Sequence, residues 1–308
     1  MENNTIENNK SNDKKDIENF IKAGKIAKKV LDTSKKMIIP GESYLDIAET
    51  IEKMIIDEGG KIAFPTNISI NENAAHYTPK INDDKILKEN DLVKIDFGVH
   101  VEGCISDNAY TIDLSNQNGK LVEASKNALD AATSYMKAGR KVGDIGEVIE
   151  NEITKLGFKP IENLTGHMIK PYLLHAGEII PNIKTDDDYI LKEGDVFAVE
   201  PFATDGHGAV KEGTDLEIYS LAEMKNVRMR QSRQILAHIL QNYFTLPFSK
   251  RWLITTVNSQ ITLGAALREM TRSGILHTYP VLKEVENGLV SQAEHTVIVE
   301  KDSVKILL

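Results

Sequence analysis

Two aspartates, Asp96 and Asp107, lie in the segment LVKIDFGVHVEGCISDNAYTIDL and could act together. The segment predicts two strands joined by a tight turn near Val101 to Gly103, which would set the two aspartates nearly opposite each other on one face. Like charges in that position are destabilising. Such a pair either raises the pKa of one carboxyl strongly or binds a cation, and hard divalent metal ions prefer oxygen ligands. Proton sharing within a carboxylate dyad is the alternative.

A second group of reactive side chains follows in LTGHMIKPYLLHAGEIIP, which contains His167 and His175, and then in Glu200. The histidines are eight residues apart, which is not the i, i+4 spacing of two metal ligands on one helix. The spacing therefore predicts one ligand and one nearby polar partner. Glu294 begins the strand-like segment EHTVIVE and by itself would be an ordinary solvated strand end; no role is predicted for His295 beside it.

An internal repeat indicates how these residues are brought together. The segments 41–61 and 139–159 align without gaps and are identical at nine of 21 positions. A second pair, ILKENDLVKID (86–96) and ILKEGDVFAVE (190–200), superposes Asp96 on Glu200 at the ends of two apolar strands. A duplicated, pseudo-symmetric fold would bring one acid from each half to a shared centre. The alternative is that acids simply terminate strands.

The rest of the chain predicts a mixed α/β domain with an insertion. Segment 206–275 has no counterpart in the first half and shows helical periodicity, so we expect an inserted helical subdomain. Residues 1–15 contain almost no apolar side chains and are predicted to be a disordered tail, which leaves 16–308 as the folded domain.

Composition limits the classes of function. A formal net charge of -9 argues against nucleic acid as the main ligand, because phosphate binding needs a basic surface. The single cysteine, Cys104, excludes an intramolecular disulfide and is typical of a reducing compartment. No stretch approaches the ~20 apolar residues that span a bilayer, so a cytoplasmic protein is predicted.

The residues named above resemble the superfamily of methionine aminopeptidase, aminopeptidase P and prolidase. The segment FPTNISINENAAHYTP (64–79) is similar to its substrate-side motif, and TGHMIKPYLLHAGEIIP with the insertion is similar to type II methionine aminopeptidases in their compact archaeal form. The resemblance implies the pita-bread fold, an α/β arrangement of two duplicated halves with pseudo-two-fold symmetry, here with a winged-helix-like insert.

The resemblance also implies the site. Its five metal ligands match Asp96, Asp107, His167, Glu200 and Glu294. These would hold two divalent ions per subunit, of Co, Mn, Fe or Zn, with Glu200 also moving protons. The residues beside the substrate would be His76, His175, Phe64 and Leu174, the last two lining the methionine pocket.

The implied activity is hydrolysis of the N-terminal methionine from nascent proteins and peptides with a small second residue, by a hydroxide that two metal ions activate. The resemblance further implies a monomer close to the ribosome, with no membrane partner and no specific nucleic acid.

Two rival interpretations remain. Aminopeptidase P and prolidase share the ligands but carry an additional N-terminal domain, and here EPFATDGHG stands where they have a sequence such as EPGxY. A non-enzymatic relative that binds RNA or ribosomes is favoured by the basic run KNVRMRQSR (225–233). Such relatives have lost metal ligands, whereas all five are present here.

Overall fold

The two copies of the internal repeat form equivalent structures in the computed structural model, which describes residues 2–308, with side chains from residue 14. The first copy gives helix α2 (Tyr44–Asp57) and the second gives α4 (Val142–Lys155). Each copy begins at a glycine with positive φ and has a second one after its helix, Gly59 or Gly157, a conformation that costs glycine little. Gly41 N donates to Leu87 O at 2.8 Å, and Gly139 N donates to Leu191 O at 2.8 Å. The duplication inferred from the sequence is therefore present in the backbone hydrogen bonds.

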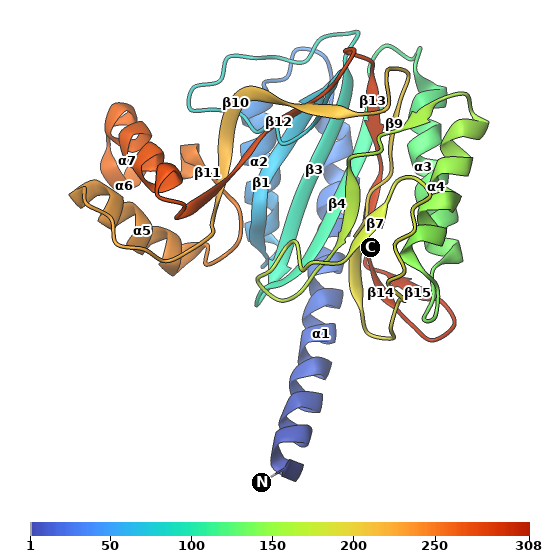
Figure 1. The fold of residues 1–308 in the computed structure, drawn as a ribbon. Helices are drawn as coiled ribbons and strands as arrows, with labels where there is room; N and C mark the ends of the chain where they lie inside the picture. Colours follow the sequence, from blue (N-terminus) through green and yellow to red (C-terminus); the bar gives the residue numbers. More distant parts are fainter. Residues whose placement is uncertain (1) are drawn as a thin grey trace.

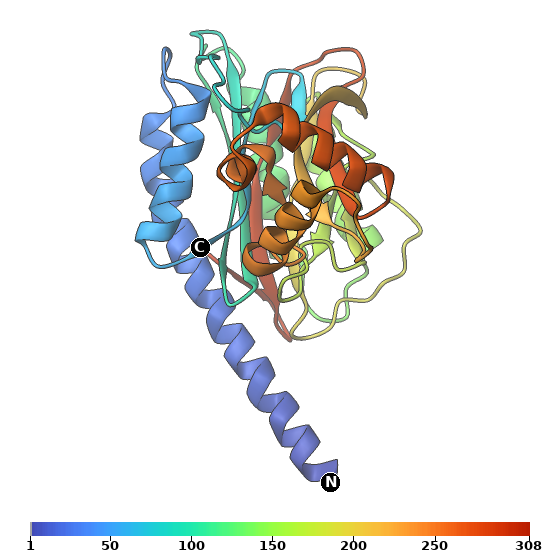
Figure 2. The same ribbon diagram turned by 90° about the vertical axis from the view of Figure 1, so that its left-hand side faces the viewer.

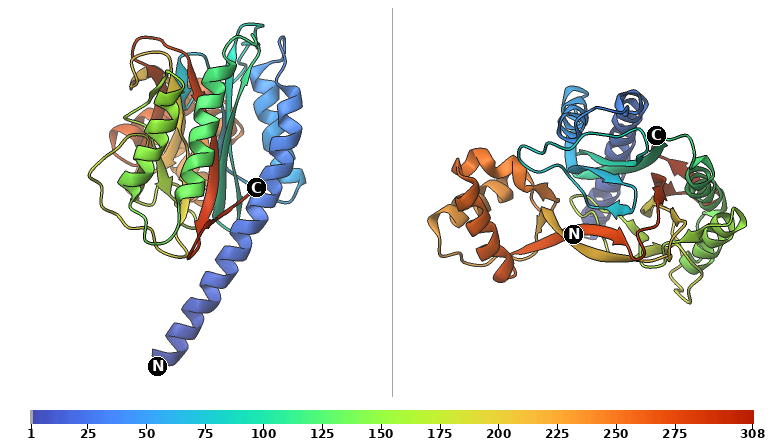
Figure 3. Two further views of the ribbon diagram at one scale, coloured as in Figure 1. Left: turned by 90° about the vertical axis from the view of Figure 1, so that its right-hand side faces the viewer. Right: turned by 90° about the horizontal axis from the view of Figure 1, so that it is seen from above.

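A curved eight-stranded sheet forms the centre of the fold (Figures 1 and 3). Its order is β1-β3-β4-β14-β8-β6-β7, and β15 pairs with β14. The strands are β1 (Lys61–Ile70), β3 (Leu92–Val101), β4 (Cys104–Asp113), β6 (Thr165–Met168), β7 (Ile179–Pro181), β8 (Val196–Val199), β14 (Glu294–Val299) and β15 (Val304–Ile306). All described neighbours in this sheet are antiparallel.

Four helices cover the outer face of this sheet. They are α1 (Glu2–Ser34), α2, α3 (Gly119–Tyr135) and α4. Apolar residues of α1 and α2 pack on β1, β3 and β4, and those of α3 and α4 pack on β8 and β14. Because strand residues alternate between faces, these contacts leave the intervening residues of the same strands on the inner face. The short 3-10 helix η1 (Lys35–Met37) joins α1 to the loop before α2.

The first turns of α1 extend away from the rest of the fold (Figures 1 and 2). The helix is continuous back to Glu2, over the segment where the sequence predicts a disordered tail. The disorder of residues 1–15 stays a prediction.

A second sheet lies across the inner face, with strand order β11-β10-β12-β2. Its strands are β2 (Asn73–Ala75), β10 (Val210–Leu221), β11 (Phe248–Ser249) and β12 (Leu276–Glu284). A three-stranded sheet of β13 (Val290–Gln292), β9 (Phe202–Thr204) and β5 (Lys159–Pro160) adjoins the second half.

Within residues 206–275, where the sequence predicts a helical insertion, strand β10 comes first and a cluster of helices follows at one side of the molecule (Figures 1 and 2). It contains α5 (Arg230–Asn242), the 3-10 helix η2 (Lys250–Leu253), α6 (Ile254–Val257) and α7 (Gln260–Arg272). These elements share a hydrophobic core of their own, centred on Ile235, Ile239 and Leu263. Strands β10 and β12 connect the cluster to the main domain. None of the helices in residues 2–308 is long and apolar enough to cross a membrane.

Candidate active site and metal centre

The predicted metal ligands lie in two adjacent rows across the inner face of the main sheet. In the first row, Asp96 pairs with Ala109, and Ala109 pairs with Glu294. The register between β14 and β8, continued by one residue, sets Glu200 opposite Glu294. Residues in one such row point to the same face of a sheet. Asp96, Glu294 and Glu200 therefore share the inner face.

The second row is two residues along the same strands. Asp107 pairs with Gly98, and the hydroxyl of Thr296 accepts from Asp107 N at 2.7 Å. Thr296 pairs with Ala198, which pairs with His167. The two rows differ by two positions, so they share one face.

The register refines the predicted arrangement of the two aspartates. Asp96 and Asp107 lie on the same face of a hairpin whose turn is Glu102–Gly103, both with positive φ. They are diagonal neighbours rather than directly opposite, because the two-residue turn pairs Val101 with Cys104. The diagonal spacing leaves room for an ion between carboxylates that a direct pairing would force together.

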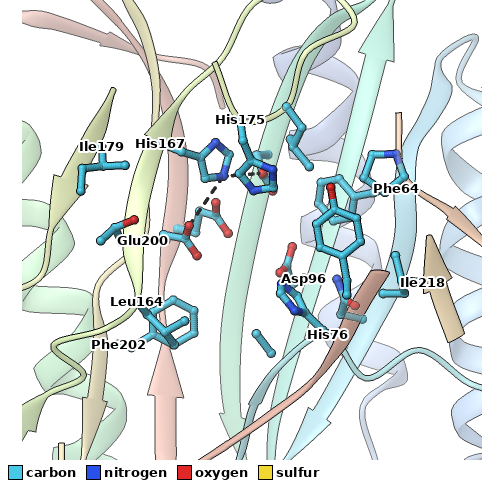
Figure 4. Close-up of a pocket in the computed structure, with 18 of the residues that line it drawn as sticks. Phe64, His76, Asp96, Leu164, His167, His175, Ile179, Glu200, Phe202 and Ile218 are labelled. Atoms are coloured by element: carbon cyan, nitrogen blue, oxygen red, sulfur yellow. Dashed lines mark ion pairs between the residues drawn. The ribbon is translucent and has the colours of Figure 1, made fainter. Parts of the chain in front are cut away.

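Curvature of the main sheet brings predicted ligands on separate strands close together. Two strands separate Asp107 from His167, which in a flat sheet would set their backbones about 14 Å apart. The Nε2 atom of His167 lies 3.6 Å from Asp107 Oδ2 and 3.6 Å from Glu200 Oε1, as the dashed lines in Figure 4 mark. Ligand atoms of Asp107, His167 and Glu294 all lie within 4.8 Å of one another. The three buried residues therefore have the geometry of a metal-binding group.

Burial and mutual repulsion dominate the electrostatics of the four carboxylates. Burial raises the pKa of Asp96 to about 7, although hydrogen bonds from Gln292 and Asn67 oppose the rise. Burial, followed by the charges of the neighbouring carboxylates, raises the pKa of Asp107 and Glu294 well above the usual range. The pKa of Glu200 rises for the same two reasons. Several anions buried together are unfavourable unless cations neutralise them.

Unsatisfied polar atoms indicate the same need for a cation. The Oδ1 atoms of Asp96 and Asp107 are buried and have no hydrogen-bond partner among the described residues. Buried polar atoms are nearly always paired, so each exception requires an explanation. The oxygens and the imidazole face one another, and burial holds the pKa of His167 well below its ordinary value, so that the ring is neutral as a metal ligand must be. The donor set fits a divalent metal.

A cavity of about 330 Å³ opens onto these residues (Figure 4). Phe64 and Leu174, predicted to line an apolar pocket, are both buried and both line it. Phe64 lies over Gly98, where an added Cβ would come within 2.3 Å of its ring. Only glycine at position 98 leaves space for this aromatic wall.

Both predicted substrate-side histidines also line the cavity. His76 has a positive φ of 67°, and its Nδ1 lies 3.2 Å from Pro280 O. His175 lies beside the ligand group, with its ring centroid 4.4 Å from that of His167. Burial lowers the pKa of His76 and of His175 to about 4, which leaves both rings neutral at physiological pH. His295 points to the opposite face from Glu294 and does not reach the cavity, as expected.

Several residues in or beside the site were not predicted from the sequence. Gln292 donates to Glu294 Oε2 at 3.3 Å, and both Gln292 and Asn67 bond Asp96. Gln292 stands two residues before Glu294, a spacing that could have indicated it. Tyr279 packs edge-on against His76, with ring centroids 5.6 Å apart. It comes from β12, in the second sheet, and nothing in its local sequence predicts that strand's position.

Comparison with known proteins agrees with this geometry. Residues 18–239 match Metallopeptidase family M24. The methionine aminopeptidase of Pyrococcus horikoshii is 52% identical over 292 residues, which cover 94% of this chain and 99% of the relative. That of Archaeoglobus fulgidus is 50% identical over 283 residues, covering 92% and 95%.

Solved structures show the same fold. A thermophilic Arx1 superposes with a TM-score of 0.81 at 19% identity, covering 94% of this chain and 89% of the other. The methionine aminopeptidase of Thermotoga maritima gives a TM-score of 0.69 at 22% identity, covering 95% and 96%. Prolidase from Pyrococcus furiosus gives 0.62 at 18% identity, covering 96% of this chain and 64% of the other. The pita-bread architecture that the family resemblance implies is thereby confirmed.

The family match and the high identity over nearly the full length of both relatives leave one assignment, which the buried Asp, His and Glu group fits chemically. This chain belongs to metallopeptidase family M24 and, within it, to the metal-dependent methionine aminopeptidases.

Proposed function

We propose that the five inner-face residues hold two divalent metal ions, of Co, Mn, Fe or Zn, at which the N-terminal methionine is removed. The ligands would be Asp96, Asp107, His167, Glu200 and Glu294. The observation that carries the proposal is the buried anionic group with unpaired oxygens, which four carboxylates cannot sustain without cations. When bound, two ions would activate a water molecule and polarise the peptide carbonyl.

Glu200 would act as the proton carrier of the reaction. Its carboxyl lies at the ligand group, and its raised pKa suits a group that takes a proton from water and returns it to the leaving amine. The same residue would serve as ligand and as general base, as its position at the centre allows.

The two histidines would play different roles. The contact of His76 Nδ1 with a carbonyl oxygen requires a proton on Nδ1, so in the neutral ring Nε2 is an acceptor. His76 would therefore accept from the N–H of the scissile peptide bond. No such contact fixes the tautomer of His175, which is free to donate to the developing oxyanion, where one donor is typically worth about 3 to 4 kcal/mol.

Substrate selection follows from the two parts of the cavity lining, the carboxylates and the apolar side chains. The anionic ligand group would attract the free N-terminal ammonium, which explains exopeptidase rather than endopeptidase cleavage. Phe64 and Leu174 would enclose the methionine side chain. We propose that the enclosed rim admits only a small second residue, and that the enzyme is a cytoplasmic monomer that meets its substrates near the ribosome.

The test is release of free methionine from Met-Ala-Ser by metal-stripped protein, with Co, Mn, Fe or Zn restored singly. Ala-Pro-Ala is the control substrate, and titration calorimetry counts the ions bound. Two ions per chain and metal-dependent release from the methionine peptide alone support the proposal. Cleavage of Ala-Pro-Ala would transfer the protein to the proline-directed enzymes. Absence of turnover with every metal would favour a binding protein of this fold.

A further inference from the structure

A buried ion pair joins the inserted subdomain to the main domain. The guanidinium of Arg251, in η2, donates to both oxygens of Glu52, in α2, at 2.9 Å and 2.5 Å. Trp252 Nε1 donates to the same carboxylate at 3.0 Å. Both charged side chains are less than a tenth exposed. A bidentate pair of this kind fixes both distance and orientation.

On the side of the main domain, Glu52 supports an irregularity of β1. The pairing of β1 with β3 shifts register on both sides of Phe64. Pro65 has no N–H, and the N–H of Thr66 donates to Glu52 Oε1 at 3.3 Å instead of to the neighbouring strand. β-bulges redirect side chains near active sites. Here the residues on either side, Phe64 and Asn67, line the cavity.

On the side of the insertion, Arg251 lies two residues after the end of β11. Ser249 of β11 pairs with Ile218 of β10, and Pro247 immediately precedes β11. Ile218 and Pro247 both line the cavity, as do Phe64 and Asn67 of β1. The ion pair therefore connects two walls of one cavity without lining it.

The internal repeat provides a natural comparison. Glu150 is the equivalent of Glu52, and it also accepts from a backbone N–H, that of Lys184 at 2.8 Å. No arginine reaches Glu150 among the described residues, and it lines none of the active-site cavity. The glutamate is common to both halves, whereas among the described residues its arginine partner is found only in the first half, where the insertion contacts α2.

We propose that the Glu52–Arg251 pair sets the width of the apolar slot and thereby determines selectivity for the methionine side chain. Both are positioning residues, because neither touches the cavity. They act by holding the bulge of β1 and the β11 segment at a fixed separation. This inference rests on the proposed assignment of Phe64 and its neighbours as the slot for methionine.

The experiment uses three variants of the full chain. Glu52→Gln with Arg251→Met removes both charges together, because a lone buried charge could prevent folding. Arg251→Lys keeps the charge but loses the bidentate contact. Glu150→Gln is the matched control in the other half. Melting curves and fluorescence of Trp252, which is the only tryptophan, verify folding.

Each variant is assayed for kcat and KM on Met-Ala-Ser and on Leu-Ala-Ser, and for metal binding by calorimetry. We expect the double variant to lose about tenfold in discrimination between the two peptides, mainly through a higher KM for the methionine peptide, while kcat changes little. Arg251→Lys should change in the same direction by less. Metal binding and the Glu150→Gln variant should match the wild type.

Unchanged discrimination in the folded double variant and in Arg251→Lys would overturn the inference and reduce the pair to a structural contact. Equal loss in Glu150→Gln would do the same. Failure of the wild type to release methionine would instead refute the proposed function, and the two failures are thereby distinguished.

Discussion

Two buried sets of carboxylate oxygens in this enzyme have opposite surroundings. Glu284 is fully buried, and its two oxygens accept from four backbone N–H groups, those of His207, Gly208, Glu286 and Gly288. Burial alone would raise the pKa of Glu284, but these hydrogen bonds together hold it below the usual range. At the proposed metal centre Glu294 receives one hydrogen bond from the described side chains, and burial followed by the neighbouring carboxylates raises its pKa. Burial is common to both sites, so the lack of hydrogen-bond donors around Glu294 is what supports the proposed binding of cations there.

The largest expected effect comes from removing one ligand. Asp107→Ala should lower kcat/KM on Met-Ala-Ser by on the order of 10³-fold or more, because the centre loses a ligand that no neighbour can replace. Asp113→Asn, on the same strand but away from the cavity, is the control and should keep wild-type activity. A modest loss in Asp107→Ala would show that this oxygen is not needed to hold the metal.

Metal removal should destabilise the protein. A ligand that binds only the folded state adds about 4 kcal/mol when it exceeds its Kd about 1,000-fold. The melting temperature should therefore fall by several degrees in chelator and return when metal is restored. The Glu284→Gln variant should show the same drop, because its site does not depend on metal. An unchanged melting temperature would mean that the carboxylates are stable without cations.

Glu284→Gln should cost about 2 to 3 kcal/mol, because an amide NH₂ then faces backbone donors that a carboxylate accepted from. Urea denaturation measures the loss, and Glu286→Gln, an exposed neighbour, should be nearly neutral. The loss should depend on pH. Since the folded pKa of Glu284 is lowered, its stabilisation is complete above the unfolded pKa of about 4.3 and disappears as pH falls through the folded value. The two denaturation curves should therefore converge in acid.

The smallest predicted effect is a gain, not a loss, of stability. In metal-free protein at neutral pH, Asp107→Asn should raise stability by about 1 kcal/mol. The buried carboxyl must either take up a proton on folding or stay ionised beside its neighbours, and the neutral amide avoids both costs. Urea denaturation in chelator would measure the gain, which should vanish or reverse once metal is present. A loss of stability in chelator would contradict the contrast with Glu284.

The sequence predicts much of this fold because identical residues at aligned positions reveal the duplication. The glycines at 41 and 139 and the matched segments 86–96 and 190–200 specify the two halves. Only Glu200 follows the end of its strand, as predicted, whereas Asp96 lies within β3, which continues to Val101. Alternation along β3 and β4 correctly places Asp96 and Asp107 on one face. The two-residue turn at Glu102 and Gly103 sets the register that makes the two aspartates diagonal neighbours. The alternation of side chains alone does not predict this register.

The contacts that were not predicted come from tertiary packing. Tyr279 and Ile218 reach the cavity from the second sheet, whose position over the first depends on the whole insertion. Arg251 meets Glu52 although the two are 199 residues apart. The local sequence around each residue does not predict the pairing, since each would be an ordinary charged residue on a helix surface.

The position of β14 has a consequence for how this enzyme is made. This strand lies between β4 and β8, in the middle of the sheet, and it supplies Glu294. Until it has been synthesised, each half presents an unpaired strand edge, and such edges invite aggregation. The two halves can be joined only by a segment that is translated after both of them. With Glu294 as one of the proposed metal ligands, catalytic activity is expected only after β14 has paired with the strands of both halves.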